Sequence, residues 1–357
     1  MTTPFHIGVS SDFHTDIPGA LEPVLARILD PLPHVTWAYY DSPSDRAVSP
    51  AAIADCDGVI VLASHFRAES FTGSDRLAVI ARWGVGYDRI DTAAATANDV
   101  VLAITVDAVR RPVAEAIVTL LLALAKKLPA KDRIVRTGRW DLKAQTFGLG
   151  LTGKTLGSVG VGNIGGEMFR LFAPFDFGRR IAYDPYTSPE RAAQLNVELV
   201  DLETVFRESD FVTVNCPLTA ETQGIVNAAR LALMKPSAYL INTARGPIVV
   251  QADLTAALQA GQIAGAGLDV FEEEPLDVNH PLIQMENVIL SPHALAWTDE
   301  LYKLNGELAC ENVLAVLQGT IPRWPVNRDV LARPGFQAKL AALKERWSEL
   351  TGLVSAD

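Results

Sequence analysis

The chain has 357 residues, of which 49% are hydrophobic and 20% are charged, which is typical of a globular protein large enough for two domains. Its formal net charge of −11 argues against binding to nucleic acid or to a membrane surface, because both require a basic face. The three cysteines, Cys56, Cys216 and Cys310, have no metal-like spacing, so we expect reduced thiols, no bound metal and a cytoplasmic location.

The first hundred residues alternate between short apolar strands and helical segments, a pattern that predicts a parallel sheet covered by helices. The predicted strands span residues 5–9, 35–40, 58–63 and 79–82. Ligands of such sheets bind at the carboxyl ends of the strands. His65 follows the third strand, and Gly84, Val85 and Gly86 follow the fourth. Glycines there let a small anion approach backbone N–H groups, although a plain turn would explain Gly84 and Gly86 equally well.

Residues 113–128 form an apolar segment, and Pro112 suits the first turn of a helix there. A helix that is apolar on most faces is expected to be buried between domains or subunits, and this one is too short to cross a bilayer. Arg110 and Arg111 precede it. They could hold an anionic substrate or be solvated charges.

Gly160, Gly162 and Gly165 follow the apolar strand at 156–161 and have the G-x-G-x-x-G spacing of a nucleotide-binding βαβ unit. The next helix would direct its N-terminal N–H groups at phosphates. A second strand ends in Asp184, where a dinucleotide fold places the carboxylate that binds the adenosine ribose. That charge would repel a 2′-phosphate, so NAD is favoured over NADP. Because Pro185 follows, Asp184 could also be an ordinary turn residue.

The βα alternation continues through strands predicted at residues 210–215, 238–242, 264–270 and 288–290. Three polar residues follow these strands. Arg245 could hold a carboxylate with its two-pronged guanidinium, and His293 could move a proton near neutral pH. Glu274 could accept a hydrogen bond from the imidazole, which would fix its tautomer and keep it protonated to higher pH. Beside a nicotinamide, this set implies hydride transfer between NAD(H) and a 2-oxo or 2-hydroxy acid.

Each of these residues also has a structural interpretation. His293 could cap a strand end with its ring bonded to the backbone. Glu274 could belong, with its two acidic neighbours, to a solvated turn, and Arg245 could form a structural ion pair with Asp269. The placement of all three after a dinucleotide motif favours the catalytic interpretation.

Several motifs, in this order, resemble those of the D-isomer-specific 2-hydroxyacid dehydrogenase family, which includes phosphoglycerate, hydroxypyruvate and D-lactate dehydrogenases. They lie at residues 84–91, 113–115, 160–165, 184, 241–246, 267–275 and 291–293. The resemblance covers roughly residues 50–325. Unlike many members, the chain has bulky Leu295 and Trp297 shortly after His293.

The resemblance implies that Arg245 binds the substrate carboxylate and carbonyl, that His293 is the acid/base and that Glu274 pairs with it. Asp269 would lie near the nicotinamide carboxamide. The implied contacts of NAD are Gly160, Gly162, Asn163, Ile164, Gly165, Asp184, Cys216, Pro217, Thr243, Ala244, Arg245, Asp269 and His293. The implied contacts of substrate are His65, Gly84, Val85, Gly86, Arg245 and His293.

The implied fold is α/β, with two Rossmann-like or flavodoxin-like domains, each a doubly wound parallel sheet. The dinucleotide domain, residues 108–298, is inserted in a substrate domain formed by residues 1–107 and 299–357. We expect helices at 299–318 and 334–357, and a homodimer, since family members are typically dimers. The expected activity is that of an NAD-dependent D-2-hydroxyacid dehydrogenase or 2-oxoacid reductase. The alternatives are an NAD(H)-sensing corepressor-like binding protein and a formate- or phosphite-type dehydrogenase on the same fold.

Overall fold

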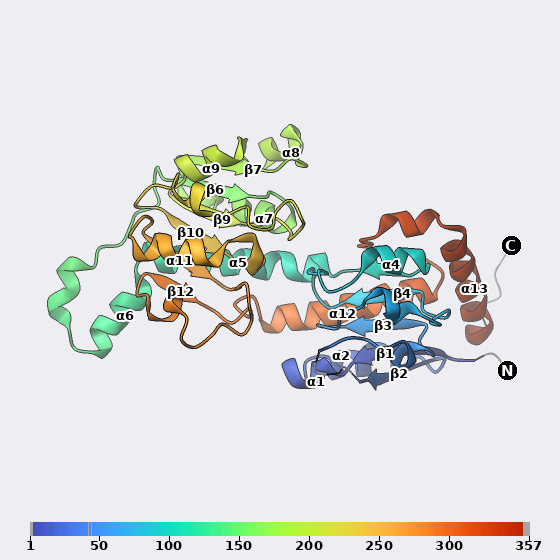
Figure 1. The fold of residues 1–357 in the computed structure, drawn as a ribbon. Coiled ribbons are helices and arrows are strands. Elements are labelled where there is room, and N and C mark those ends of the chain that lie inside the picture. The colour runs from blue at the N-terminus through green and yellow to red at the C-terminus, as the bar shows by residue number, and fades with distance from the viewer. Residues whose placement is uncertain (1–2, 42, 44, 353–357) are drawn as a thin grey trace. The chain divides into compact units, whose positions relative to one another are not determined.

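Two α/β units, each built on its own parallel sheet, make up the chain in a computed structural model that describes residues 3–41, 43 and 45–352. Unit 1 comprises Met1–Val109 and Thr298–Asp357, and unit 2 comprises Arg110–Trp297. Unit 2 is thus inserted between the two segments of unit 1 (Figure 1). Both sheets are parallel throughout, which confirms the predicted fold class.

The sheet of unit 1 has five strands in the order β2-β1-β3-β4-β5. Its strands are β1 (Phe5–Ser10), β2 (Val35–Tyr40), β3 (Gly58–Val61), β4 (Val79–Arg82) and β5 (Val101–Ala103). Its helices are α1 (Asp12–Asp16), α2 (Glu22–Ile28), α3 (Pro50–Ile53), α4 (Thr92–Ala97), α12 (Asp299–Leu317) and α13 (Pro334–Thr351). Helix α12 packs on β3 and β4, so the C-terminal segment covers a sheet formed by the N-terminal one. The sequence predicted the first four strands. Strand β5 was not predicted, because its apolar run has only three residues.

The sheet of unit 2 has seven strands in the order β12-β11-β10-β9-β6-β7-β8. Its strands are β6 (Thr155–Val159), β7 (Arg179–Tyr183), β8 (Glu198–Leu199), β9 (Phe211–Val214), β10 (Tyr239–Asn242), β11 (Gly265–Leu268) and β12 (Val288–Leu290). Its helices are α6 (Leu128–Arg136), α7 (Asn163–Leu171), α8 (Pro189–Gln194), α9 (Leu202–Glu208), α10 (Ala228–Leu231) and α11 (Gln251–Gln259). The chain leaves β6 first toward β7 and later toward β9, so the strand order switches direction beside β6. Ligands of open α/β sheets bind at such a switch point.

Apolar side chains cover both faces of this sheet. Along β9, Phe211 joins one buried cluster while Val212 and Val214 join the other, because successive side chains of a strand point to opposite faces. Helix α5 (Val106–Ala125) covers one face with buried leucines, and Gly267 of β11 admits it closely. A Cβ at Gly267 would lie 3.1 Å from Leu120.

Helix α5 corrects one prediction. It begins at Val106, so Pro112 lies inside the helix rather than in its first turn. Proline has no N–H, and Pro112 therefore leaves one carbonyl of the preceding turn without its usual intrahelical donor. The apolar pattern that marked residues 113–128 begins only after the proline, whereas the helix starts a full two turns earlier.

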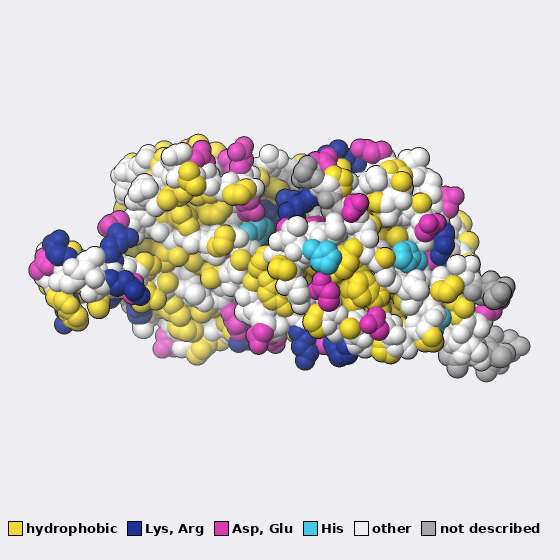
Figure 2. Space-filling view, turned by 90° about the horizontal axis from the view of Figure 1, so that it is seen from below, with side chains coloured by type: hydrophobic (Ala, Val, Ile, Leu, Met, Phe, Trp, Pro, Cys, Tyr) yellow, Lys and Arg dark blue, Asp and Glu magenta, His cyan; other side chains and the backbone are white. Residues whose placement is uncertain are grey.

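An arm formed by residues 126–150 leaves the body of unit 2 between α5 and β6 (Figure 1). None of its residues is buried. Its two ends are joined, since the N–H of Leu149 donates to the carbonyl of Ala125 at 2.6 Å. Figure 2 shows basic and hydrophobic side chains together on this arm.

Among the residues that the structure describes, no helix is both long and apolar enough to cross a membrane.

Candidate active site

The glycine motif forms a sharp turn between β6 and α7. Gly160 has φ of +99°, and a Cβ there would lie 2.8 Å from the Asn215 backbone. A Cβ at Gly165 would lie 2.6 Å from the carbonyl oxygen of Gly160, so this glycine allows helix and turn to approach. By contrast, a Cβ at Gly162 would meet nothing within 4 Å. Gly162 is the N-cap of α7 and provides no side-chain cap, so the turn is open toward the N–H groups of the helix, as a pyrophosphate requires.

Asp184 follows β7 and is tied to this turn. One carboxylate oxygen accepts the Val161 N–H at 2.7 Å, and the other accepts the N–H groups of Tyr186 at 2.9 Å and Thr187 at 3.0 Å. Asp184 therefore orders its own turn and the glycine turn together. A carboxylate has about four acceptor positions, so one more donor, such as a ribose hydroxyl, can be accommodated.

Cys216 and Pro217 follow β9 on the other side of the glycine turn. Burial raises the pKa of the Cys216 thiol to about 11, and the charge of Asp184 adds to the rise. The thiol is therefore neutral at physiological pH. In this state it offers an apolar neighbour to a ligand lying beside the glycine turn.

The proposed acid/base pair is formed in the structure. His293 Nδ1 lies 2.8 Å from Glu274 Oε2, and the other carboxylate oxygen accepts the Phe271 N–H at 3.1 Å. Burial raises the pKa of Glu274, but the hydrogen bond and charge of His293, the Phe271 amide and the charge of Arg245 together lower it below its usual value. The carboxylate is therefore ionised at neutral pH and can hold Nδ1 as a donor, which leaves Nε2 for another partner.

Arg245 leaves the end of β10 through a turn closed by Asn242. The side-chain oxygen of Asn242 accepts the Ala244 N–H at 3.0 Å, and its side-chain NH₂ group donates to the Arg245 carbonyl oxygen at 3.0 Å. The Arg245 guanidinium donates to the Ala244 carbonyl oxygen at 2.7 Å and lies near enough to Glu274 to lower its pKa. Thr243 lies in the same turn and is partly buried. Strands β10, β11 and β12 are adjacent, so their carboxyl ends bring Arg245, Glu274 and His293 to one edge of the sheet.

Asp269 directly follows β11 and is 4% exposed. Its carboxylate accepts the N–H groups of Ala294 and Leu295, the two residues after His293. Sequence reasoning anticipated neither these bonds nor the role of Asn242, because both connect side chains to backbone groups whose positions are set by the fold. The one sequence feature that marked Asn242 and Asp269 was their position as polar residues at the end of an apolar strand.

The predicted substrate contacts His65, Gly84, Val85 and Gly86 lie in unit 1. Burial lowers the pKa of His65, and the charges of three neighbouring arginines lower it further, whereas the charge of Asp45 raises it. Gly84 has φ of +129°, and its N–H donates to the hydroxyl of Thr105 at 2.8 Å. The first of these glycines therefore serves the fold of the loop, and the substrate role of the segment stays a prediction.

Of the two arginines before the apolar segment, Arg111 is a surface charge. It donates to Glu115 at 2.6 Å and to Glu167 of α7 at 3.3 Å, and its side chain is half exposed. This exposure and these two surface ion pairs favour the interpretation of Arg111 as a solvated charge over that of a substrate-binding group. Burial raises the pKa of Glu167, but its bonds to Arg170 and Arg111 lower the pKa below its usual value, and the charges of Arg170 and Arg110 add to this lowering.

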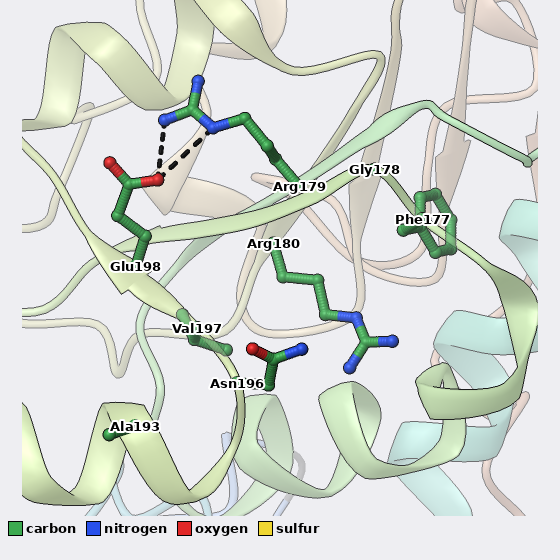
Figure 3. A pocket seen from close by; sticks show the side chains of 8 residues that line it. All are labelled: Phe177, Gly178, Arg179, Arg180, Ala193, Asn196, Val197 and Glu198. Carbon is green, nitrogen blue, oxygen red and sulfur yellow. Dashed lines mark hydrogen bonds and ion pairs between the residues drawn. The ribbon is translucent and has the colours of Figure 1, made fainter.

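A hollow of about 400 Å³ lies at the opposite end of the sheet, where β7 and β8 begin (Figure 3). Arg179 there donates to Glu198 at 2.7 Å and also pairs with Glu208, and Arg180 donates to the Ala173 carbonyl oxygen at 2.9 Å. The guanidinium groups that line the hollow thus have partners within the fold. The hollow is separate from the candidate site residues, which follow the carboxyl ends of the strands. Among the described residues, no group of three or more His, Cys, Asp or Glu side chains could hold a metal ion.

Residues 118–294 match the family model described as D-isomer specific 2-hydroxyacid dehydrogenase, NAD binding domain. The chain is 38% identical over 325 residues to the glyoxylate reductase of Thermofilum pendens, an alignment that spans 89% of this chain and 96% of that protein. The chain belongs to the D-isomer specific 2-hydroxyacid dehydrogenase family.

Solved structures of family members have the same fold as this chain. A D-lactate dehydrogenase from Aquifex aeolicus, complexed with NAD and lactic acid, superposes with a TM-score of 0.77 at 25% identity, over 88% of this chain and 96% of that one. A D-isomer specific 2-hydroxyacid dehydrogenase from Lactobacillus delbrueckii ssp. bulgaricus, in its NAD-complexed form, superposes with a TM-score of 0.72 at 25% identity, over 90% and 99%. The predicted family, oxidoreductase class and NAD cofactor are confirmed: this dehydrogenase uses NAD and acts on a CH–OH group.

Proposed function

We propose that this dehydrogenase interconverts a small 2-oxo acid and its D-2-hydroxy acid, with His293 as acid/base, Glu274 as its partner and Arg245 as the carboxylate-binding group. The observation that carries the proposal is the 2.8 Å contact between His293 and Glu274 beside the charge of Arg245. We further propose that unit 2 is the NAD-binding domain, since the matched family model lies within it, and that unit 1 is the substrate domain.

When bound, NADH supplies a hydride to the carbonyl carbon. Arg245 contributes a planar pair of donors that orients the substrate carboxylate. His293 donates its Nε2 proton to the carbonyl oxygen as negative charge develops there. Glu274 accepts from Nδ1–H throughout, so the neutral ring that remains is the Nδ1–H tautomer, with Nε2 ready to accept a proton in the reverse direction.

The adenosine side of the site follows from the glycine turn. We propose that the N–H groups at the start of α7 bind the pyrophosphate, with Asn163 and Ile164 at its edge, and that Asp184 binds the ribose. The open space at Gly162 supports the first assignment. Asp184 supports the second with its remaining acceptor capacity.

The glyoxylate reductase similarity favours a substrate with a short chain, and reduction as the direction to test first. NADH oxidation should be followed with glyoxylate, hydroxypyruvate, pyruvate and sugar-derived 2-oxo acids. We expect His293→Ala to lower kcat by about 10²- to 10⁴-fold with the Kd for NADH within about twofold of the parent. His280→Ala is the matched control, because it removes an imidazole from the same unit.

Unchanged turnover in His293→Ala would remove this residue from the mechanism. NADH binding without oxidation of any 2-hydroxy acid or reduction of any 2-oxo acid would favour a corepressor-like binding protein. Turnover of formate or phosphite alone would favour a dehydrogenase of that type, whose substrate has no ketone oxygen to protonate.

We propose that the chain forms a homodimer through the arm. Its exposed apolar side chains include Leu128, Val135, Trp140 and Phe147, between 56% and 75% exposed. It carries seven basic and two acidic residues on a chain of net charge −11, which favours an acidic partner such as a second copy. Phe147→Asp should lower the molar mass measured by light scattering, while Val278→Asp, at an exposed site elsewhere in unit 2, should leave it unchanged. A monomeric parent protein would refute the proposal.

We also propose a cytoplasmic location, supported by the three unpaired cysteines Cys56, Cys216 and Cys310.

A further inference from the structure

We propose that Asp269 is a positioning residue that holds His293 in its working orientation through the backbone of the following two residues. The inference rests on the proposed role of His293 and adds a residue through which that role depends on the fold. It differs from the contact with the nicotinamide carboxamide that the family resemblance implies for Asp269.

The contacts of the Asp269 carboxylate all lead to the loop that carries His293. One oxygen accepts the N–H of Ala294 at 3.1 Å and that of Leu295 at 3.2 Å, and the second accepts the Leu295 N–H at 3.3 Å. Asp269 is 4% exposed, so little water competes with the amides for its carboxylate. An anionic acceptor forms stronger hydrogen bonds than a neutral one, which suits it to fix a loop.

The loop needs such support at His293. The φ of His293 is +57°, in the left-handed region. This conformation costs a non-glycine residue free energy, so it persists only where surrounding contacts hold it. The segment is held on both sides. Before His293, the N–H of Ser291 donates to the carbonyl oxygen of Leu268 at 2.9 Å, and after it come the two amides bound by Asp269. This left-handed residue is therefore fixed between two anchors at the end of β11.

Asp269 also links the two halves of the proposed site. Its own N–H donates to the carbonyl oxygen of Asn242 at 3.0 Å, and the Asn242 side chain closes the turn that carries Arg245. The relative positions of Arg245 and His293 thus depend on bonds that meet at the ends of β10 and β11. A displacement of about 1 Å at a reacting group can cost about 100-fold in rate.

The test compares Asp269→Ala and Asp269→Asn, with Asp277→Ala as a control that removes an exposed acid from the same unit. We expect Asp269→Ala to lower kcat about 100-fold with the Kd for NADH, from fluorescence titration, within about twofold of the parent. Asp269→Asn keeps an acceptor oxygen and should recover kcat to within about tenfold of the parent. This variant tests the proposal if the alanine variant does not fold.

A double-mutant cycle separates this proposal from the proposed function. If Asp269 acts through His293, Asp269→Asn in a His293→Ala background causes no further loss of kcat. An undiminished loss in that background, or a rise in the Kd for NADH that parallels the loss of kcat, would overturn the positioning role. If His293→Ala alone leaves turnover unchanged, the proposed function itself fails.

Discussion

Replacing Glu274 by glutamine removes the negative charge beside His293 while keeping the size of the side chain. The carboxylate attracts the positive charge that the imidazole gains when it accepts a proton, across 2.8 Å. Oxidation of the 2-hydroxy acid moves a proton onto Nε2, so its transition state loses this attraction in the variant and kcat for oxidation should fall. Reduction moves that proton away from the ring, so the missing charge should not slow it.

The size of the loss follows from the geometry. Two unit charges 2.8 Å apart attract by about 1.5 kcal/mol at the dielectric constant of water. The His293 side chain is 45% exposed and that of Glu274 is 35% exposed, so solvent screening leaves roughly 1 kcal/mol. About 1.4 kcal/mol corresponds to a tenfold change in rate, so kcat for oxidation should fall by about fivefold.

The assay measures kcat for oxidation and for reduction at the same pH and compares their ratio with that of the parent. The folded-state pKa of Glu274 is lowered from its usual 4.5. The stability that this carboxylate contributes is present above its unfolded pKa and is lost as the pH falls through the lower folded value, so the assays should be run above about pH 5. Glu273→Gln removes an equal charge one residue away and should leave the ratio unchanged. A ratio of oxidation to reduction in Glu274→Gln that equals or exceeds the parent value would refute the reasoning.

Two further substitutions test the binding assignments. Arg245→Lys should raise the KM for the 2-oxo acid by about 10- to 100-fold, because an ammonium group cannot form the paired bonds of a guanidinium; an unaltered kcat/KM in steady-state assays would contradict this. Asp184→Ala should lower the ratio of kcat/KM for NADH over NADPH and should also raise the KM for NADH, since three backbone amides lose their acceptor. In Asp184→Asn the loss of charge remains but an acceptor is kept, so the ratio should fall with a smaller change in KM. A cofactor preference that is unchanged in both variants would mean that another group sets it.

The fold was accessible from the sequence because parallel strands that are buried on both faces form nearly continuous apolar runs. Strand β4, Val79–Arg82, is an example, and its predicted and observed bounds coincide. The elements that were missed have weaker patterns. Strand β5 has three residues, and helix α6, Leu128–Arg136, has no buried residue and therefore no apolar stripe set by a core.

The residues of the candidate site were accessible for a different reason. In a parallel sheet, side chains that follow neighbouring strands gather at one edge, whatever the length of the intervening helices. Arg245 and His293 are 48 positions apart in the chain, yet each follows a strand of the same three-stranded segment. Residue type and position after a strand were enough to select them. The sequence pattern did not predict the distance in space between the His293 imidazole and the Glu274 carboxylate.

The supporting bonds could not be inferred in this way, because their acceptors and donors are backbone groups in irregular segments. Asn242 is bonded within its own turn, whereas Asp269 binds amides 25 and 26 residues away. Both side chains are almost fully buried, and an unbonded polar group there would cost stability. A buried polar residue directly after an apolar strand therefore indicates a backbone partner in a neighbouring loop. When that loop also carries a candidate acid/base, as the loop of His293 does, the buried residue is the place to look for control of its orientation.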